Sequence, residues 1–160
     1  DECCFVHAGD GCIISRDMDY IKKLIETFER LNADAAFLAL EIENPKQYGI
    51  IEGKEIENGI FKVKKAVEKP EIPKTNLAIM AMYIFRTNII TSLRVSKPGK
   101  KGEVQLTDAT QKLVDWGLRV YAVKLDKSYS HLDIGSPERY WEALELSYKQ
   151  FGKRSKSLDR

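Results

Sequence analysis

The sequence has no long apolar run and almost no excess of one charge. None of its apolar segments approaches the roughly 20 residues needed to span a bilayer, and no basic segment followed by an apolar stretch opens the chain as a secretory signal would. Its 26 basic and 24 acidic residues leave a formal net charge of +2, far from the basic footprint of a dedicated nucleic-acid binder. The sequence therefore predicts a soluble protein with neither a membrane nor a nucleic acid as partner.

Cysteine is also scarce. Cys3, Cys4 and Cys12 form neither an even disulfide framework nor a C-x-x-C metal pair, and a reducing, cytoplasmic compartment is the simplest interpretation. The chain has no initiator methionine, and its first apolar run begins at residue 3. We therefore expect that a segment is missing upstream.

What is present indicates one globular α/β domain. The chain has 160 residues, 43% of them apolar and 31% charged, enough for a sizeable core. Residues 3–8 form an apolar run that ends at Gly9-Asp10-Gly11 and predicts a buried central strand. Residues 18–32 carry apolar side chains at helical spacing, and residues 35–41 are apolar again. This strand, helix, strand order predicts a right-handed crossover unit.

Further elements follow along the chain. Segments 49–51 and 61–67 predict a hairpin, and residues 77–85 predict a buried strand. Helices are expected at about 88–95 and 106–116, followed by a strand at 118–125. Ser136, Pro137 and Glu138 together are typical of a helix start, and this helix should end near residue 148. The predicted organisation is one domain over residues 1–148 and a basic tail over residues 149–160.

Two aspartates stand where strands are expected to end. Asp10 lies in a glycine-flanked loop after a strand, and Asp133 precedes the Ser136 helix start. Both could ligate one Mg²⁺, since that ion takes one or two protein carboxylates plus phosphates and water. Each also has an ordinary interpretation: Asp10 as a turn residue, Asp133 as support for the next helix. His7 and His131 lack metal-site spacing and are interpreted as structural or surface residues.

Glu68-Lys69-Pro70 closes a predicted strand. Proline favours an extended conformation at the residue before it, so both side chains should be held at the strand exit. A glutamate accepts hydrogen bonds from two sugar hydroxyls, and a lysine places a compact positive charge on a phosphate. The alternative is that Lys69 continues a solvated lysine face formed by residues 62, 64 and 65.

Six short segments of the chain resemble those of a known family in both order and spacing. The likeness extends from about residue 5 to residue 148. The six matching motifs are Ala8-Gly9-Asp10, Tyr48-Gly49-Ile50-Ile51, Val67-Glu68-Lys69-Pro70, Thr75-Asn76-Leu77-Ala78-Ile79, Gly102-Glu103-Val104-Gln105-Leu106-Thr107-Asp108-Ala109 and Leu132-Asp133-Ile134-Gly135-Ser136-Pro137-Glu138. With them the chain resembles the glucose-1-phosphate uridylyltransferases and thymidylyltransferases, which are sugar-1-phosphate nucleotidyltransferases.

This resemblance implies a fold, a reaction and a set of site residues. The fold would be the C-terminal portion of a nucleotide-diphospho-sugar transferase, with a Rossmann-like, mixed and mostly parallel sheet and flanking helices. The reaction would transfer a nucleotidyl group from UTP or dTTP to a sugar 1-phosphate, with glucose 1-phosphate expected. Roles are implied for six residues: Asp10 and Asp133 as Mg²⁺ ligands, Lys69 at the phosphate, and Glu68, Gly49 and Asn76 in substrate binding.

Two departures from the family pattern bear on these expectations. The N-terminal G-x-G-T-R signature, which grips the triphosphate, is absent, so full activity of this chain alone is not expected. Ala81 also stands where relatives carry glycine, and its methyl group could narrow the sugar pocket. The competing hypothesis is a non-catalytic binding or regulatory module that binds sugar phosphate or a partner subunit without turnover. A metal-dependent phosphoesterase ranks far lower, because the sequence lacks the additional His and Asn/Asp clusters that a two-metal site would need. Homo-oligomerisation is left open.

Overall fold

The computed structural model describes residues 2–14, 19–99 and 102–155. The strands are β1 (Cys3–His7), β2 (Gly11–Ile14), β3 (Ala35–Glu41), β4 (Gly49–Glu57), β5 (Ile60–Glu68), β6 (Leu77–Arg86), β7 (Val120–Lys124) and β8 (Ser130–Asp133). The helices are α1 (Asp19–Arg30), a short 3₁₀ helix η1 (Pro45–Gln47), α2 (Asn88–Val95), α3 (Leu106–Asp115) and α4 (Pro137–Ser155). The predicted succession is confirmed, and β2 is an additional strand.

The main sheet has the order β1-β6-β3-β7-β5-β4, and β2 pairs with β8 in a separate two-stranded sheet. Within the described residues, β3 and β7 form the one parallel pair, and every other pairing is antiparallel. The prediction of a mixed sheet is therefore confirmed, but "mostly parallel" is wrong. A short connection accounts for one of these pairs, because a two-residue turn can join only antiparallel neighbours. Such a turn, Asn58-Gly59, closes the predicted β4–β5 hairpin, with Gly59 at φ +74°.

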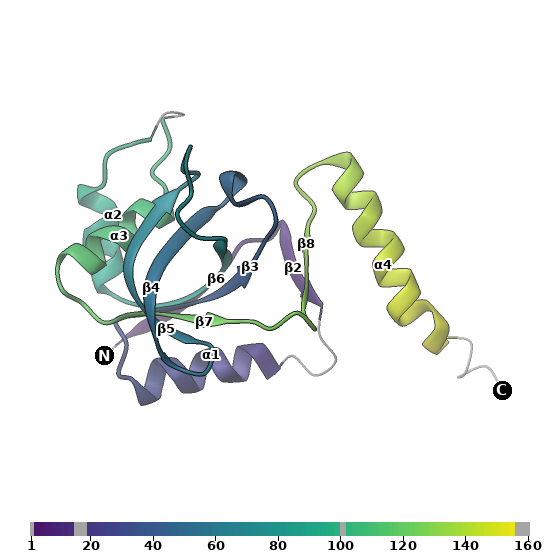
Figure 1. The fold of residues 1–160 in the computed structure, drawn as a ribbon, viewed down its shortest axis with the longest axis horizontal. Coiled ribbons are helices and arrows are strands. Elements are labelled where there is room, and N and C mark those ends of the chain that lie inside the picture. Colours follow the sequence, from purple (N-terminus) through teal and green to yellow (C-terminus); the bar gives the residue numbers. More distant parts are fainter. Residues whose placement is uncertain (1, 15–18, 100–101, 156–160) are drawn as a thin grey trace.

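Helices cover both faces of the main sheet, as Figure 1 shows. On one face, Ala36 and Leu38 of β3 pack in a core with Leu24 of α1. On the other, the alternate residue Phe37 packs with Leu113 of α3. Strand side chains alternate between faces, so a run buried on both sides is apolar throughout. This explains why residues 35–41 show no polar alternation.

The first strand is not the buried central strand that its apolar sequence predicts. β1 pairs with β6 and lies at the edge of the main sheet. The Phe5 side chain is 49% exposed. The error arises because strand order depends on long-range pairing, whereas an apolar run shows only that a segment can be buried.

The last helix extends beyond its predicted end. α4 continues past Tyr148 to Ser155, so residues 149–155 of the predicted tail are helical, and residues 156–160 lie outside the described part. A Glu145–Lys149 ion pair at i,i+4 spacing supports this extension, as does the preference of cations for helix C-termini. In Figure 1, α4 stands away from the sheet beside β8. No helix within the described ranges is both long and apolar enough to cross a membrane.

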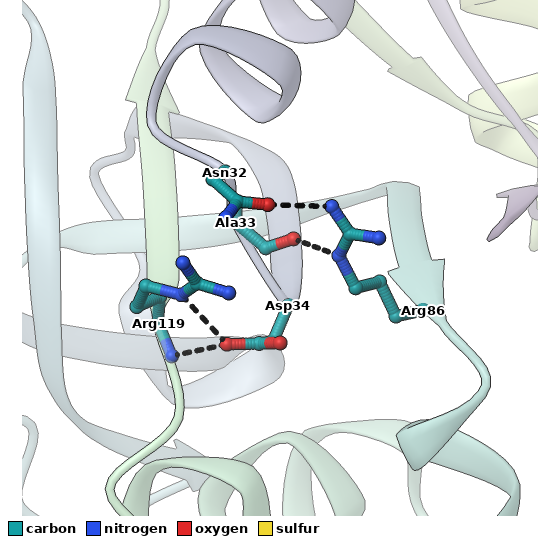
Figure 2. A network of polar contacts seen from close by, with 5 residues as sticks. All are labelled: Asn32, Ala33, Asp34, Arg86 and Arg119. Carbon is teal, nitrogen blue, oxygen red and sulfur yellow. Dashed lines mark hydrogen bonds and ion pairs between the residues drawn. The ribbon is translucent and has the colours of Figure 1, made fainter. Parts of the chain in front are cut away.

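A polar network joins the beginnings of β3 and β7 to the end of β6 (Figure 2). Asp34 accepts hydrogen bonds from the backbone N–H of Arg119 at 2.9 Å and from its Nε at 3.1 Å. Arg86 donates to the Ala33 carbonyl at 2.9 Å and to Asn32 Oδ1 at 2.7 Å. Burial opposes ionisation of Asp34, but the hydrogen bonds and charge of Arg119, and the charge of Arg86, outweigh it and hold its pKa below the ordinary value. The network adjoins a cavity of about 440 Å³.

Candidate functional site

A second cavity, of about 350 Å³, brings together four of the six predicted site residues: Asp10, Gly49, Glu68 and Lys69. They come from separate parts of the chain: the β1–β2 turn, the start of β4 and the end of β5. The residues that line the cavity are Ala8, Asp10, Gly11, Gln47, Tyr48, Gly49, Glu68, Lys69, Ile79, Ala81, Tyr83, Gln105, Leu106, Thr107 and His131. Ala81, whose methyl group was expected to narrow a sugar pocket, is among them.

The two predicted magnesium ligands lie close together along the backbone, Asp10 in the turn before β2 and Asp133 at the end of β8. Gly11, next to Asp10, pairs with Asp133 across β2 and β8, and the Ile134 N–H donates to the Asp10 carbonyl at 2.8 Å. The Asp133 side chain is outside the described part of the structure, so the pairing concerns its backbone. Asp10 is exposed and lines the cavity. Carboxylate oxygens are the donors that Mg²⁺ prefers, and the backbone brings two residues of that type close together.

Asn76 is not brought to the cavity. Its carbonyl accepts a hydrogen bond from the Ile42 N–H at 3.0 Å, just before β6 begins, and the residue is exposed. The neighbouring Thr75 hydroxyl donates to the Ile51 carbonyl at 2.6 Å. In this structure the Thr75-Asn76 segment fastens β6 to its neighbours, and Asn76 is absent from the residues that line the cavity.

Lys69 has an unusual backbone conformation. Its φ is +42°, in the left-handed region that non-glycine residues rarely adopt. The prediction that Pro70 keeps Lys69 extended is therefore wrong. The Lys69 N–H donates to the Tyr48 carbonyl at 3.1 Å, which holds the turn to the segment before β4. Strained conformations of this kind persist where surrounding structure enforces them, and they cluster at functional sites.

The side chains of Glu68 and Lys69 face the same cavity. Lys69 Nζ lies 3.8 Å from Glu68 Oε1. The Lys69 side chain is 59% exposed and the Glu68 side chain 21%. Lys62, Lys64 and Lys65 are exposed along β5 and do not line this cavity. The backbone turn at Lys69 thus separates its side chain from the solvated lysine face of β5. The alternative interpretation had assigned Lys69 to that face.

Gly49 lies where a side chain has no room. It is the register partner of Glu68 across β4 and β5. A Cβ atom at this position would lie 2.6 Å from Thr107 Oγ1 and 3.0 Å from Glu68 Oε2. The absence of a side chain therefore lets Thr107 and Glu68 meet directly above the Gly49 backbone.

Other residues of the cavity were not predicted to act. Thr107 donates its hydroxyl to Glu68 Oε2 at 2.7 Å. Tyr83 is buried, and burial, followed by the Glu68 charge, raises its pKa well above the ordinary value, so its hydroxyl stays protonated. His131 contacts the edge of the Tyr48 ring, with 6.4 Å between centroids. Thr107 and Tyr48 belong to motifs of the family resemblance, and this membership could have marked them as candidate site residues. Tyr83 lies within the apolar run of β6, and no sequence pattern distinguishes it from its neighbours.

Comparison with known proteins identifies the family. The protein-family model described as Nucleotidyl transferase matches residues 1–150 of the chain. The chain belongs to this family. The resemblance to sugar-1-phosphate nucleotidyltransferases is thereby confirmed. Over 155 residues the chain is 33% identical to a UTP–glucose-1-phosphate uridylyltransferase of Pseudomonas aeruginosa, a match covering 95% of this chain and 54% of that protein.

Solved structures of the family share the fold. A UDP-glucose pyrophosphorylase complexed with UDP-glucose has a TM-score of 0.85 at 30% identity, covering 93% of this chain and 57% of that chain. The UTP-bound UGPase from Acinetobacter baumannii is 23% identical, with a TM-score of 0.75. The match covers 96% of this chain and 54% of the Acinetobacter chain, and it supports the fold alone. The chain thus spans about half the length of these relatives.

Proposed function

We propose that the protein transfers a nucleotidyl group from UTP or dTTP to a sugar 1-phosphate, with glucose 1-phosphate the expected acceptor. The observation that carries this proposal is the convergence of Asp10, Gly49, Glu68 and Lys69 on one cavity. Family membership and 33% identity to a protein named as a UTP–glucose-1-phosphate uridylyltransferase support it.

In the proposed reaction a phosphate oxygen of the sugar 1-phosphate forms a bond to the α-phosphorus of the nucleoside triphosphate. The bond from the α-phosphorus to the oxygen that bridges the α- and β-phosphorus atoms breaks, and pyrophosphate leaves with that electron pair. Lys69 provides positive charge for the attacking phosphate, and Glu68 accepts hydrogen bonds from the sugar hydroxyls. Placing the acceptor and its charge in one cavity favours alignment and charge neutralisation, which supply most of the rate in phosphoryl chemistry.

Asp10 and Asp133 are the residues that would hold a magnesium ion in this proposal. When bound, Mg²⁺ would neutralise charge on the substrate phosphates. Within the described ranges no three His, Cys, Asp or Glu side chains cluster as a protein-only cage. A site of two aspartates completed by phosphate and water oxygens is nevertheless ordinary for this ion.

Pyrophosphate release provides the test. It should be assayed with UTP and with dTTP, each with glucose 1-phosphate and Mg²⁺, on this chain and on any longer gene product. UTP is the first nucleotide to assay, because it appears in the name of the Pseudomonas aeruginosa relative. We expect release to require both substrates and Mg²⁺, and to be abolished in Asp10→Asn and in Asp133→Asn while both variants remain folded.

The alternative of a non-catalytic sugar-phosphate-binding module gives a different result. It predicts that glucose 1-phosphate binds, as measured by calorimetry, without pyrophosphate release under any condition. Absence of both binding and release would contradict both functions. Release that is unchanged in both aspartate variants would remove these residues from the site.

A further inference from the structure

Thr107 connects α3 to the site through its hydroxyl group. It is the second residue of α3 and is 5% exposed. Its Oγ1 donates to Glu68 Oε2 at 2.7 Å, a contact between residues 39 positions apart in the sequence. A hydrogen bond to a carboxylate is stronger than one between neutral groups, and this one orients the side chain at the end of β5.

The helix that carries Thr107 is itself fixed to its surroundings. Gln111, one turn later, accepts a hydrogen bond from the Ala66 N–H of β5 at 2.6 Å. On the other side, the buried Ser92 hydroxyl of α2 donates to the Ala109 carbonyl at 2.5 Å. α3 is therefore held against both β5 and α2, and Thr107 has a defined position relative to Glu68.

Gly49 completes this arrangement from below. Because a Cβ there would lie 2.6 Å from Thr107 Oγ1 and 3.0 Å from Glu68 Oε2, Gly49, Thr107 and Glu68 are packed in direct contact. Glu68 Oε2 accepts the hydrogen bond from the Thr107 hydroxyl, while Glu68 Oε1 lies 3.8 Å from Lys69 Nζ. The two oxygens of the carboxylate thus have different environments.

We infer that Thr107 is a positioning residue that sets sugar selectivity, by orienting Glu68 so that a sugar hydroxyl meets Oε1 beside the phosphate-binding Lys69. This inference rests on the proposed function. A carboxylate held in one orientation accepts hydroxyls from one direction, so it distinguishes sugars that differ in the orientation of a single hydroxyl. Without the Thr107 bond, Glu68 can rotate and that distinction weakens.

A purely structural role for Thr107 makes different predictions. If its hydroxyl only stabilised α3, its removal would lower stability without altering the relative affinity for two sugars. Thr110 is a matched control, since it is also buried on α3 and its hydroxyl donates to the Leu106 carbonyl of the same helix at 2.8 Å. Thr110→Val removes a buried threonine hydroxyl from the same helix without touching Glu68.

Calorimetric titrations with glucose 1-phosphate and galactose 1-phosphate test the inference. We expect Thr107→Val to weaken glucose 1-phosphate binding by about 10-fold or more, the loss of one hydrogen bond to a charged group, and to bring the ratio of the two affinities towards one. Thr107→Ser, which keeps the donor, should retain the wild-type ratio within about threefold, and Thr110→Val should retain it as well. Thr107→Ala carries the same prediction should Thr107→Val not fold.

The double variant with Glu68→Gln shows whether the effect passes through Glu68. Thr107→Val should cause little further loss of affinity once Glu68 is changed, because the two residues act as one unit. The inference alone is overturned if Thr107→Val and Thr110→Val leave the same affinity ratio while wild type binds glucose 1-phosphate. Absence of binding by wild type overturns the proposed function together with the inference.

Discussion

Two cavities of similar size lie in different parts of the main sheet, and their charged groups are used differently. In the larger, Asp34 accepts two hydrogen bonds from Arg119, and Arg86 donates to Ala33 and Asn32 (Figure 2). In the smaller, the Lys69 ammonium lies 3.8 Å from its carboxylate neighbour and is 59% exposed. The hydrogen bonds of Asp34 and Arg86 hold strands together, whereas the Lys69 ammonium is more than half exposed at an open cavity and can bind an anion. Cavity size alone would favour the larger cavity, about 440 Å³ against 350 Å³, over the one that four predicted site residues line.

Each region also contains one non-glycine residue in the left-handed conformation. Asn32, at φ +46°, follows the end of α1, where helices commonly end in this way and asparagine tolerates it. Lys69, at φ +42°, is neither glycine nor asparagine. The first conformation is explained by a helix end, whereas the second occurs in a turn that lines the smaller cavity and is held by the Tyr48 carbonyl. The comparison teaches that residue type decides whether such a φ indicates strain.

The largest expected effect would sharpen this comparison at Lys69. Lys69→Ala should lower kcat/KM for nucleotidyl transfer by roughly 100-fold or more, the size of losing one preorganised charge-stabilising contact. Steady-state kinetics of an active form of the protein provide the measurement. Lys64→Ala, on the solvated face of β5, should change kcat/KM little. Equal, small effects in the two variants would mean that Lys69 belongs to the same solvated face.

The next prediction concerns the glycine beneath Glu68. Gly49→Ala places a methyl group 2.6 Å from Thr107 Oγ1 and 3.0 Å from Glu68 Oε2, so both side chains must move. We expect glucose 1-phosphate affinity to fall by about 10-fold or more, the loss of one hydrogen bond to a charged group. Gly9→Ala is the control, since a Cβ at Gly9 would meet nothing within 4 Å. If calorimetry shows the same glucose 1-phosphate affinity for Gly49→Ala and Gly9→Ala, the crowded geometry around Gly49 is contradicted.

The network around the larger cavity should respond in stability instead. Asp34→Ala removes the acceptor of two Arg119 hydrogen bonds and should lower the free energy of unfolding by about 2 kcal/mol, as for hydrogen bonds to a charged group. Urea denaturation measures this change. Glucose 1-phosphate affinity should stay within about twofold of wild type, since Asp34 does not line the smaller cavity. A large loss of affinity in a folded Asp34 variant would break the comparison.

Acid should weaken the same network. Because the pKa of Asp34 is lower in the folded protein than its ordinary value of 3.8, its contribution to stability is fully present above about pH 4. That contribution is lost as pH falls through the folded-state pKa, when the carboxylate is protonated. Unfolding measured between about pH 2 and 6 should show a shallower acid loss in Asp34→Asn than in wild type. Identical pH profiles would exclude Asp34 from the acid response.

The smallest effects compare the two left-handed residues. Lys69→Gly relieves backbone strain but adds chain entropy to the unfolded state, so we expect a net gain of about 0.5 kcal/mol in the free energy of unfolding. Asn32→Gly removes the acceptor of the Arg86 hydrogen bond and should cost about 1 kcal/mol. Chemical denaturation of both variants decides the matter. A loss at Lys69→Gly as large as that at Asn32→Gly would contradict the interpretation of strain.

Local patterns predicted the helices and the strands other than β2, and, with the family resemblance, four residues that line the cavity. The hairpin of segments 49–51 and 61–67, the Ser136-Pro137-Glu138 helix start and the Glu68-Lys69-Pro70 strand exit all depend on neighbours in the chain. Their positions could therefore be predicted before the structure, and the structure brings Glu68 and Lys69 to one cavity with Asp10 and Gly49.

Features that depend on distant residues were missed. The Thr107–Glu68 bond joins residues 39 positions apart, and the edge position of β1 depends on pairing with β6. The φ of Lys69 is imposed by a turn that also bonds to Tyr48, against the local preference set by Pro70. The end of α4 was misjudged because the sequence from residue 152 onward lacks apolar anchors, whereas charged i,i+4 pairs such as Glu145–Lys149 also support a helix.

A titration of the ¹⁵N-labelled chain with glucose 1-phosphate, followed by two-dimensional amide NMR, tests the central claim most directly because it reports on both cavities at once. The account predicts saturable shifts at the amides of Gly49, Lys69 and Thr107, none at Asp34, Thr87 or Arg119, and loss of the shifts in Lys69→Ala. Shifts confined to the Asp34 and Arg119 region, or shifts that persist unchanged in Lys69→Ala, would contradict it.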